Sequence, residues 1–266
     1  MDTKDTTKIA QSPNTQEKQY SMVKILSIWF ASAFPMFLLV FGVLPKLISA
    51  IDVNSGILYW LMMIAGLIWQ FALSLIILKI DGYTLSWQQI GKRMWFQKPS
   101  HPKTGKKSYR LLWWVLPFIA FSGLLQIIHI PLPDIENIIP FFSRFPQYDL
   151  SSLATPEYKG AWWIMGLGLV TVLFNYLLGE EFLYRGILLP KMNGVFGRFD
   201  WLANGVLFGL YHLGKPQIII GAALFSGIMF SLPSKLFKSS WMAVIIHGVQ
   251  GIVILILILG IVLGLA

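Results

Sequence analysis

Long apolar runs dominate the pattern of hydrophobic and polar positions along this chain of 266 residues. The runs show neither the strict alternation of a half-buried strand nor the regular stripe of an amphipathic surface helix. A helix needs about 20 apolar residues to cross the roughly 30 Å hydrocarbon core of a membrane. Seven membrane segments are predicted, at residues 25–45, 56–78, 111–130, 161–189, 201–213, 217–232 and 241–265.

The predicted fold is therefore all-α, a polytopic transmembrane bundle of about seven helices, with eight as an alternative. Pro35 predicts a kink in the first segment, because proline removes a helical hydrogen bond. Residues 201–213 form a short segment that is too brief to span a membrane comfortably. The stretch 201–232 could therefore contain a re-entrant element in place of two crossing helices.

Three regions follow from the same pattern. Residues 1–22 are polar and mixed in charge, which predicts a disordered tail without a cleavable signal peptide. Residues 23–131 hold the amino-terminal membrane helices, interrupted by a basic loop at 79–110. Residues 161–266 hold the remaining helices and the candidate chemistry. No separate soluble domain is expected, since the basic loop has too little apolar content for a core of its own.

The composition agrees with a membrane protein. The chain is 56% hydrophobic and 12% charged, whereas soluble domains carry about 25% charged residues. It contains no cysteine, which excludes disulfides, thiolate metal ligands and a cysteine nucleophile. The net charge of +9 is explained by loop charges that set topology and attract anionic lipid. Nucleic-acid binding is therefore not expected.

The distribution of loop charge predicts the orientation of the helices. By the positive-inside rule, the basic loop at 79–110 is cytoplasmic and the acidic loop at 134–159 lies outside. Two further basic pairs return to the inside: Lys191 with Arg198, and Lys235 with Lys238. This alternation places the amino terminus in the cytoplasm and the carboxyl terminus outside.

The first polar cluster is the sequence GEEFLYR at residues 179–185, in the inner half of the fourth segment. Charged side chains inside a membrane are costly, so they usually face a cavity or pair with one another. Glu181 and Arg185 are four residues apart and share a helix face, where they can pair. Glu180 lies about 100° further round the helix and about 14 Å from its cytoplasmic end, where it could act as a general base. The alternative is a structural ion-pair network at a helix end.

Histidines are at the centre of two further clusters on two other predicted helices. Phe208 and His212 share a face of the fifth segment, with His212 about 17 Å from its Trp201 end. His247 lies about 9 Å from the start of the last segment, and Gln250 could orient it or donate a hydrogen bond. Each histidine alone is more often a packing residue than a catalyst. Three polar clusters at similar depth on three helices nevertheless favour one shared site.

The three clusters resemble the motifs of the CAAX protease and bacteriocin-processing family, also called CPBP or Abi. The family pattern is EExxxR, then FxxxH, then HxxxN, each on its own transmembrane helix. Here the matching positions are Glu180, Glu181 and Arg185, then Phe208 and His212, then His247. The resemblance covers residues 161–265. It implies an intramembrane endopeptidase of the CAAX type, with a bacterial plasma membrane as the expected location.

The resemblance also implies a role for each motif residue. Glu180, with His212, would activate a water molecule for attack on a peptide carbonyl. His247 would stabilise the oxyanion that forms. Glu181 and Arg185 would hold the end of the helix in place.

The third motif departs from the family pattern at one position. The family's asparagine would fall at position 251, which is Gly251 here, and the amide of Gln250 is expected to replace it. If Gln250 does not replace it, the stabilisation of the transition state is weakened, and the chain is a poor protease or a binding relative.

No cofactor is predicted, although zinc is an alternative. Glu180, His212 and His247 could form a three-ligand zinc site with one open position. However, the HExxH motif is absent, and neither histidine has an acidic partner nearby in the sequence to orient it. His101 and His129 are expected to have no catalytic role.

Two functions from different classes follow. The first is an endopeptidase that cuts a peptide or protein substrate near the cytoplasmic membrane face. That substrate would be a leader peptide, a bacteriocin-like peptide or a lipid-modified tail. The alternative is a non-catalytic bacteriocin immunity or membrane scaffold protein, which binds a partner in the same cavity. The lipid bilayer is a partner in both cases, and the sequence does not indicate an oligomeric state.

Overall fold

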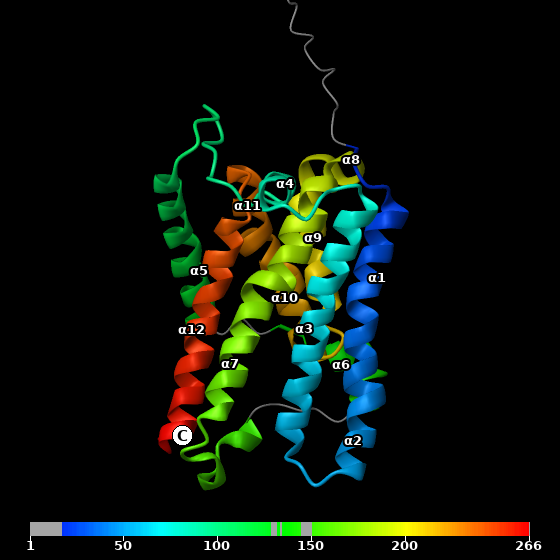
Figure 1. Ribbon diagram of the computed structural model, residues 1–266, viewed down its shortest axis with the longest axis vertical. Coiled ribbons are helices and arrows are strands. Elements are labelled where there is room, and N and C mark those ends of the chain that lie inside the picture. Colours follow the sequence, from blue (N-terminus) through cyan, green and yellow to red (C-terminus); the bar gives the residue numbers. More distant parts are fainter. Residues whose placement is uncertain (1–17, 129–131, 134, 145–150, 266) are drawn as a thin grey trace, which may run out of the picture.

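Five helical stretches are long and apolar enough to cross a membrane, and they form the frame of the molecule (Figure 1). The computed structural model describes residues 18–128, 132–133, 135–144 and 151–265. The five stretches are Met22–Ala50, Ser55–Ile80, Trp163–Lys191, Pro216–Phe237 and Trp241–Leu263. A shorter apolar helix covers Tyr109–Leu125. The prediction of an all-α, integral membrane protein is confirmed.

Several of these stretches combine α-helix with wider π-helical turns. The α-helices are α1 (Met22–Leu38), α2 (Leu44–Ala50), α3 (Ser55–Ile80), α4 (Trp87–Arg93), α5 (Val115–Ile128), α6 (Ile135–Ile138), α7 (Trp163–Leu173), α8 (Asn193–Phe196), α9 (Asp200–Tyr211), α10 (Ile219–Ser226), α11 (Leu232–Phe237) and α12 (Trp241–Leu263). The π-helical turns are Leu39–Val43, Phe174–Leu178, Phe182–Leu188 and Gly227–Ser231. The first turn joins α1 to α2, the second and third continue the stretch that begins with α7, and the fourth joins α10 to α11.

The first stretch continues through Pro35, which lies inside α1. A proline cannot donate to the carbonyl four residues earlier, which here belongs to Ala31. The Trp69 indole nitrogen of α3 donates to this carbonyl at 2.7 Å. A neighbouring helix thus supplies the hydrogen bond that the proline removes.

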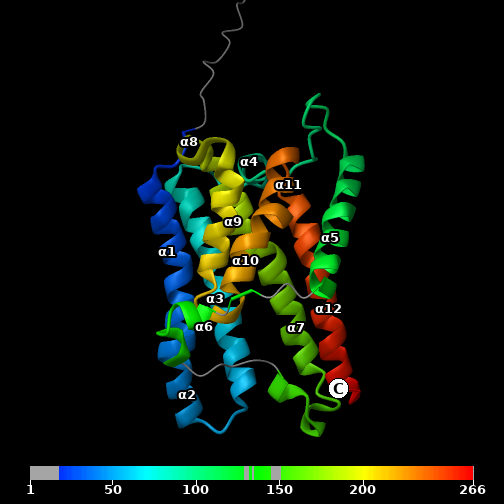
Figure 2. The ribbon, with the colours of Figure 1, turned by 180° about the vertical axis from the view of Figure 1, so that it is seen from behind.

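The predicted fifth and sixth segments form a hairpin that stops short of the opposite end of the bundle (Figure 2). α9 has 12 residues, about 18 Å at 1.5 Å per residue, whereas the hydrocarbon core is roughly 30 Å thick. α9 ends where His212 leaves the helical conformation, and the return begins at Pro216. A Cβ on Gly209 would lie 2.2 Å from the backbone nitrogen of Ala223, so this glycine lets the two arms touch. The short α9 favours the re-entrant alternative, whereas the returning stretch Pro216–Phe237 is long enough to cross a membrane, so the number of crossings stays a prediction.

The two ends of the bundle carry different segments. The start of α1, together with α4, α8 and α11, lies at one end, whereas the turn between α2 and α3 and the carboxyl terminus lie at the other (Figure 1). The basic loop and the two basic pairs belong to the first end. The predicted alternation of loops agrees with this arrangement. That the basic end faces the cytoplasm stays a prediction.

Arg93 belongs to the predicted basic loop at 79–110, but the structure buries its side chain at the basic end. Its guanidinium donates to the Tyr20 hydroxyl at 2.9 Å and to the backbone carbonyls of Ile187 at 3.1 Å and Gly186 at 3.3 Å. Burial raises the pKa of the Tyr20 hydroxyl, which keeps its proton. These contacts attach α4 and the start of α1 to the π-helical turn Phe182–Leu188.

Part of the predicted outer loop folds back against the hairpin. Ile135 of α6 and Phe142 are buried together with Ile219 of α10. These residues cover the tip of the hairpin, because the tip lies inside the bundle and exposes apolar surface there. Asp134, expected to be a solvated acid of this loop, lies outside the described residues.

Candidate active site

The fourth predicted segment changes its helical geometry at Gly179, between two π-helical turns. A Cβ at this position would lie 2.5 Å from the carbonyl oxygen of Phe174 and 3.0 Å from that of Leu67 in α3. Only glycine fits so close an approach of two backbones. π-helical turns are frequent at functional sites, and Glu180 and Glu181 follow Gly179 directly.

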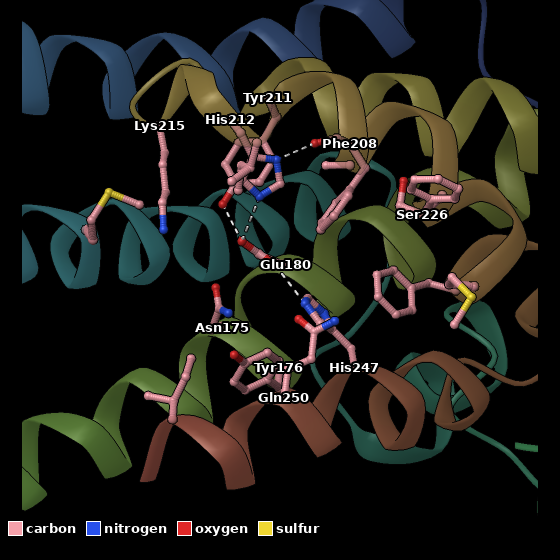
Figure 3. Close-up of a pocket in the computed structure, with 18 of the residues that line it drawn as sticks. Asn175, Tyr176, Glu180, Phe208, Tyr211, His212, Lys215, Ser226, His247 and Gln250 are labelled. Carbon is pink, nitrogen blue, oxygen red and sulfur yellow. Dashed lines mark hydrogen bonds and ion pairs between the residues drawn. The ribbon is translucent and has the colours of Figure 1, made fainter. Parts of the chain in front are cut away.

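Glu180 is buried, and its two oxygen atoms have different surroundings (Figure 3). The Tyr211 hydroxyl donates a hydrogen bond to Oε1. The Nε2 atom of His212 lies 3.9 Å from Oε1, and that of His247 lies 3.9 Å from Oε2. Within the described part of the chain, Oε2 has no hydrogen-bond partner. A separation of 3.9 Å is too long for a direct hydrogen bond but suits a bridging water molecule.

Glu181 is completely buried and contacts two nitrogen-bearing side chains. Its Oε1 accepts a hydrogen bond from Arg185 at 3.2 Å and lies 2.8 Å from Nδ1 of His247. The structure thus forms the ion pair that the spacing of four residues predicts. It also corrects one expectation, because Glu181, and not Gln250, orients His247. Sequence spacing could not show this contact, since the two residues lie on different helices.

Aromatic rings hold Arg185 and His247 in place. The guanidinium carbon of Arg185 lies 4.1 Å from the centre of the Phe208 ring and 5.2 Å from that of Phe230. The His247 ring stacks on Phe230 with 4.5 Å between ring centres. It also lies perpendicular to the Tyr176 ring at 4.6 Å. Phe208, predicted only as a motif position, therefore packs against the cation of the buried ion pair.

His212 directly follows α9 and faces Glu180 from the hairpin turn. Its Nδ1 lies 2.9 Å from the carbonyl oxygen of Phe208, which can only accept, so Nδ1 carries a proton. The same argument assigns a proton to Nδ1 of His247 beside the carboxylate of Glu181. Each neutral ring then presents an unprotonated Nε2 toward Glu180. Each protonated ring would present a hydrogen-bond donor there.

A cavity of about 760 Å³ borders Glu180 and reaches residues of α3, α5, α7, α9, α10 and α12. Its polar lining residues include Asn175, Glu180, Tyr211, His212, Lys215, His247 and Gln250. Most of the remaining wall is apolar or aromatic. This volume lies within the usual range of about 300–1,000 Å³ for ligand sites. The cavity can therefore hold part of a peptide or another apolar molecule next to Glu180.

The departure from the family motif at position 251 has a steric cause. A Cβ on Gly251 would lie 2.7 Å from two ring carbons of Tyr176 and 3.2 Å from a methyl group of Val172. Asparagine would therefore fit only if these side chains moved. The amides of Gln250 and Asn175 line the cavity instead.

Three polar residues of the site were not predicted from the sequence: Tyr211, Lys215 and Asn175. Tyr211 stands next to His212 in the second cluster, but adjacent residues point to different helix faces, so its bond to Glu180 had no spacing signal. Lys215 was visible as a charge within an apolar stretch. Asn175 lies five residues before Glu180, and both line the cavity. The π-helical turn between them changes which residues share a face.

The donor atoms around Glu180 suit zinc chemically, but no three His, Asp or Glu side chains of the described residues form a group that could hold a metal ion. His212 and His247 each lie 3.9 Å from a Glu180 oxygen, whereas ligands of tetrahedral zinc are roughly 3.4 Å apart. Metal-free catalysis stays a prediction. Of the other histidines, His101 accepts hydrogen bonds from its own loop, and His129 lies outside the described residues.

Part of the chain matches a known protein family. Residues 160–253 match the family model described as type II CAAX prenyl endopeptidase, Rce1-like. The matched region contains all three polar clusters and begins one residue before the predicted region of resemblance. No curated protein and no solved structure matches the chain. The family resemblance drawn from the motifs is confirmed.

Proposed function

We propose, from the match of residues 160–253 to the Rce1-like family of type II CAAX prenyl endopeptidases, that this chain is an intramembrane endopeptidase in which Glu180 activates the attacking water. The observation that carries the proposal is the contrast between the two glutamates. Glu181 is engaged by Arg185 and His247. Glu180 borders the cavity with a buried oxygen that has no hydrogen-bond partner among the described residues.

The first chemical step uses the gap between Glu180 and the histidines. A water molecule between Glu180 and His212 is held by both, since Oε1 of Glu180 and Nε2 of His212 are 3.9 Å apart. As the water oxygen attacks the peptide carbonyl carbon, its proton passes to Glu180. The Tyr211 hydroxyl, which donates to Oε1, keeps the carboxylate in position.

The second step resolves the tetrahedral intermediate. His247 in its protonated form donates from Nε2 to the oxyanion, and the Glu181 carboxylate at Nδ1 stabilises the positive ring. The intermediate then collapses with cleavage of the C–N bond, and Glu180 returns its proton to the leaving amine. The amides of Gln250 and Asn175 line the same cavity and are available as further donors.

The expected substrate is a peptide segment at or inside the membrane. The mainly apolar cavity wall suits hydrophobic side chains or a lipid chain. A leader peptide, a bacteriocin-like peptide and a lipid-modified tail are the three candidate classes. The name of the matching family favours the lipid-modified tail. We expect cleavage nearer the basic end of the bundle, which is the predicted cytoplasmic side.

A comparison of peptide termini tests the proposed function. Cells would express the wild type, Glu180→Gln or the control Glu157→Gln at matched levels, and termini in their membranes would be identified by mass spectrometry. Glu157 is an exposed loop carboxylate and serves as the matched control. Termini present with the wild type and the control but absent with Glu180→Gln would support proteolysis and identify the substrate. Identical termini in all three samples would contradict it.

A non-catalytic immunity or scaffold protein is the second candidate, because Gly251 replaces the asparagine of the family motif. A binding protein needs the cavity but not a proton-accepting carboxylate. This candidate predicts that Glu180→Gln and His212→Ala both retain protection or partner capture. The endopeptidase loses its function in both variants.

A further inference from the structure

Lys215 is a cation at an unusual place, the inner turn of the α9–α10 hairpin. This turn lies inside the bundle and short of its far end (Figure 2). The side chain reaches into the cavity in the direction of Asn175 (Figure 3). Both residues line the cavity wall. Lys215 is exposed, and it lines the pocket that borders Glu180.

No carboxylate of the described residues lies within ion-pair distance of Lys215. Other lysines that face the protein do have such partners, since Lys24 pairs with Asp81 and Lys235 pairs with Asp200. A charge at membrane depth is costly unless it is paired or reaches water, and such residues mark ligand sites by default. The turn is also well fixed, because the Lys215 backbone nitrogen donates to the His212 carbonyl at 2.9 Å. The cation thus lies in the same turn as His212, and no carboxylate from the described part of the chain pairs with it.

The other groups around the lysine indicate which anion fits. Among the described residues that line the cavity, there is a single lysine and no arginine. Most of the other lining residues are apolar or aromatic. Two-point contacts to a phosphate are typical of arginine, which this lining lacks, whereas lysine acts as a single point charge. One ammonium beside one amide suits a singly charged carboxylate, with the ammonium and the amide nitrogen as donors. The remaining wall suits an apolar body attached to that carboxylate.

We propose that Lys215, with Asn175, binds a carboxylate of the substrate and thereby selects which peptide bond reaches Glu180. The inference rests on the proposed function and deepens it. Lys215 and His212 belong to the same turn, so the bound carboxylate lies close to the reacting bond. Its source is either the α-carboxylate of a chain end or an acidic side chain near the cleavage point. Lys215 is a specificity-determining residue and takes no part in the bond-breaking step.

The test uses the purified full-length protein in lipid nanodiscs and three versions of a farnesylated peptide that ends in a CAAX sequence. One version has a free carboxyl terminus, the second has a carboxamide, and the third has a carboxamide and a glutamate as its last residue. We expect Lys215→Met to lower kcat/KM for the free acid at least tenfold, to the value for the amide. The amide itself should be cleaved equally by both proteins, and Lys215→Arg should retain a preference for the acid. Lys103→Met, in the exposed basic loop, is the control.

The third peptide distinguishes the two sources of the carboxylate. If it is cleaved as well as the free acid, any nearby acid serves, and if it behaves like the plain amide, the chain end is required. An equal loss of kcat/KM for the acid and amide peptides in Lys215→Met would overturn the inference, since it would show a structural role. An unchanged preference for the acid peptide in Lys215→Met would overturn it as well. In another outcome, Lys215→Met changes activity only in nanodiscs that contain anionic lipid, and equally for the acid and amide peptides. That result would assign Lys215 to a lipid phosphate and would also overturn the inference.

Binding separates this inference from the proposed function. The affinities of Glu180→Gln protein and of Glu180→Gln/Lys215→Met protein for the acid and amide peptides would be compared. A preference for the acid that depends on Lys215 supports the anion site even if no peptide is ever cleaved. Absence of that preference overturns the anion site even if Glu180-dependent cleavage is found.

Discussion

The Nδ1 atom of His247 lies 2.8 Å from Oε1 of Glu181, and the same oxygen accepts a hydrogen bond from Arg185. The second glutamate of the EExxxR motif therefore joins two of the three motifs. It leaves the first glutamate, Glu180, as the carboxylate that faces the cavity. This division of roles leads to distinct expectations for the two residues.

Glu181→Gln should lower kcat by about 10–100-fold, the usual effect of removing a carboxylate that orients a functional histidine. The glutamine oxygen can still accept one hydrogen bond, but it does not stabilise the protonated His247 ring. KM should change little, because Glu181 does not line the cavity. Steady-state kinetics on a cleaved peptide provide the measurement. A rise in KM at unchanged kcat would show that Glu181 contributes to substrate binding instead.

Tyr211→Phe should reduce kcat about tenfold or more, since a hydrogen bond to a charged group contributes about 1.5–3 kcal/mol. The hydroxyl donates to Glu180, whereas the ring packs against His212 with 4.3 Å between ring centres. Phenylalanine keeps this packing, so thermal unfolding should show a folded protein. Tyr109→Phe, at an exposed position, is the matched control. Wild-type activity in Tyr211→Phe would show that Glu180 does not depend on this contact.

Gly251→Ala should destabilise the protein, because its Cβ would meet the Tyr176 ring at 2.7 Å. Overpacking of this kind costs about 1–3 kcal/mol. Gly248→Ala is the control in the same helix, since a Cβ there meets no atom within 4 Å. Thermal unfolding in one detergent should give a lower Tm for the first variant only. Equal Tm values would mean that Tyr176 moves aside easily, and that asparagine could also be accommodated.

A zinc chelator such as 1,10-phenanthroline should leave the rate of peptide cleavage unchanged. The proposed mechanism uses Glu180 and two histidines without a metal ion. Metal content would be measured by atomic spectrometry on the same preparation. Loss of activity with the chelator, restored by added zinc, would favour a zinc site at Glu180, His212 and His247 and would require these side chains to move closer together.

The helical segments and the family were predictable because they depend on local patterns. Apolar runs predicted all five long helical stretches among the seven expected segments, and the spacing of four residues predicted the pair Glu181 and Arg185. The contact between Glu181 and His247 was not predictable, since it depends on how two helices pack. Burial of Arg93 was missed for the same reason, because a basic residue in a loop is normally solvated. The π-helical turns around Gly179 were not predicted either, because no clear sequence pattern marks a π-helical turn.

The position of Lys215 in the cavity wall was not predictable either. Its charge stood out in an apolar stretch, but only the hairpin geometry turns it toward the cavity. Had α9 crossed the whole membrane, a residue just beyond His212 would have reached water at the opposite end. The short length of α9 was readable from the sequence, and the consequence for Lys215 was not.

The rate of cleavage of one farnesylated CAAX peptide by purified wild-type and Glu180→Gln protein tests the central claim most directly. General-base catalysis contributes about 10²–10⁴-fold, so Glu180→Gln should lose at least a hundredfold in kcat. Glu157→Gln should match the wild type, and all three proteins should unfold at similar temperatures. A Glu180→Gln protein that cleaves the peptide within a few-fold of the wild-type rate would contradict the assignment of Glu180 as the base.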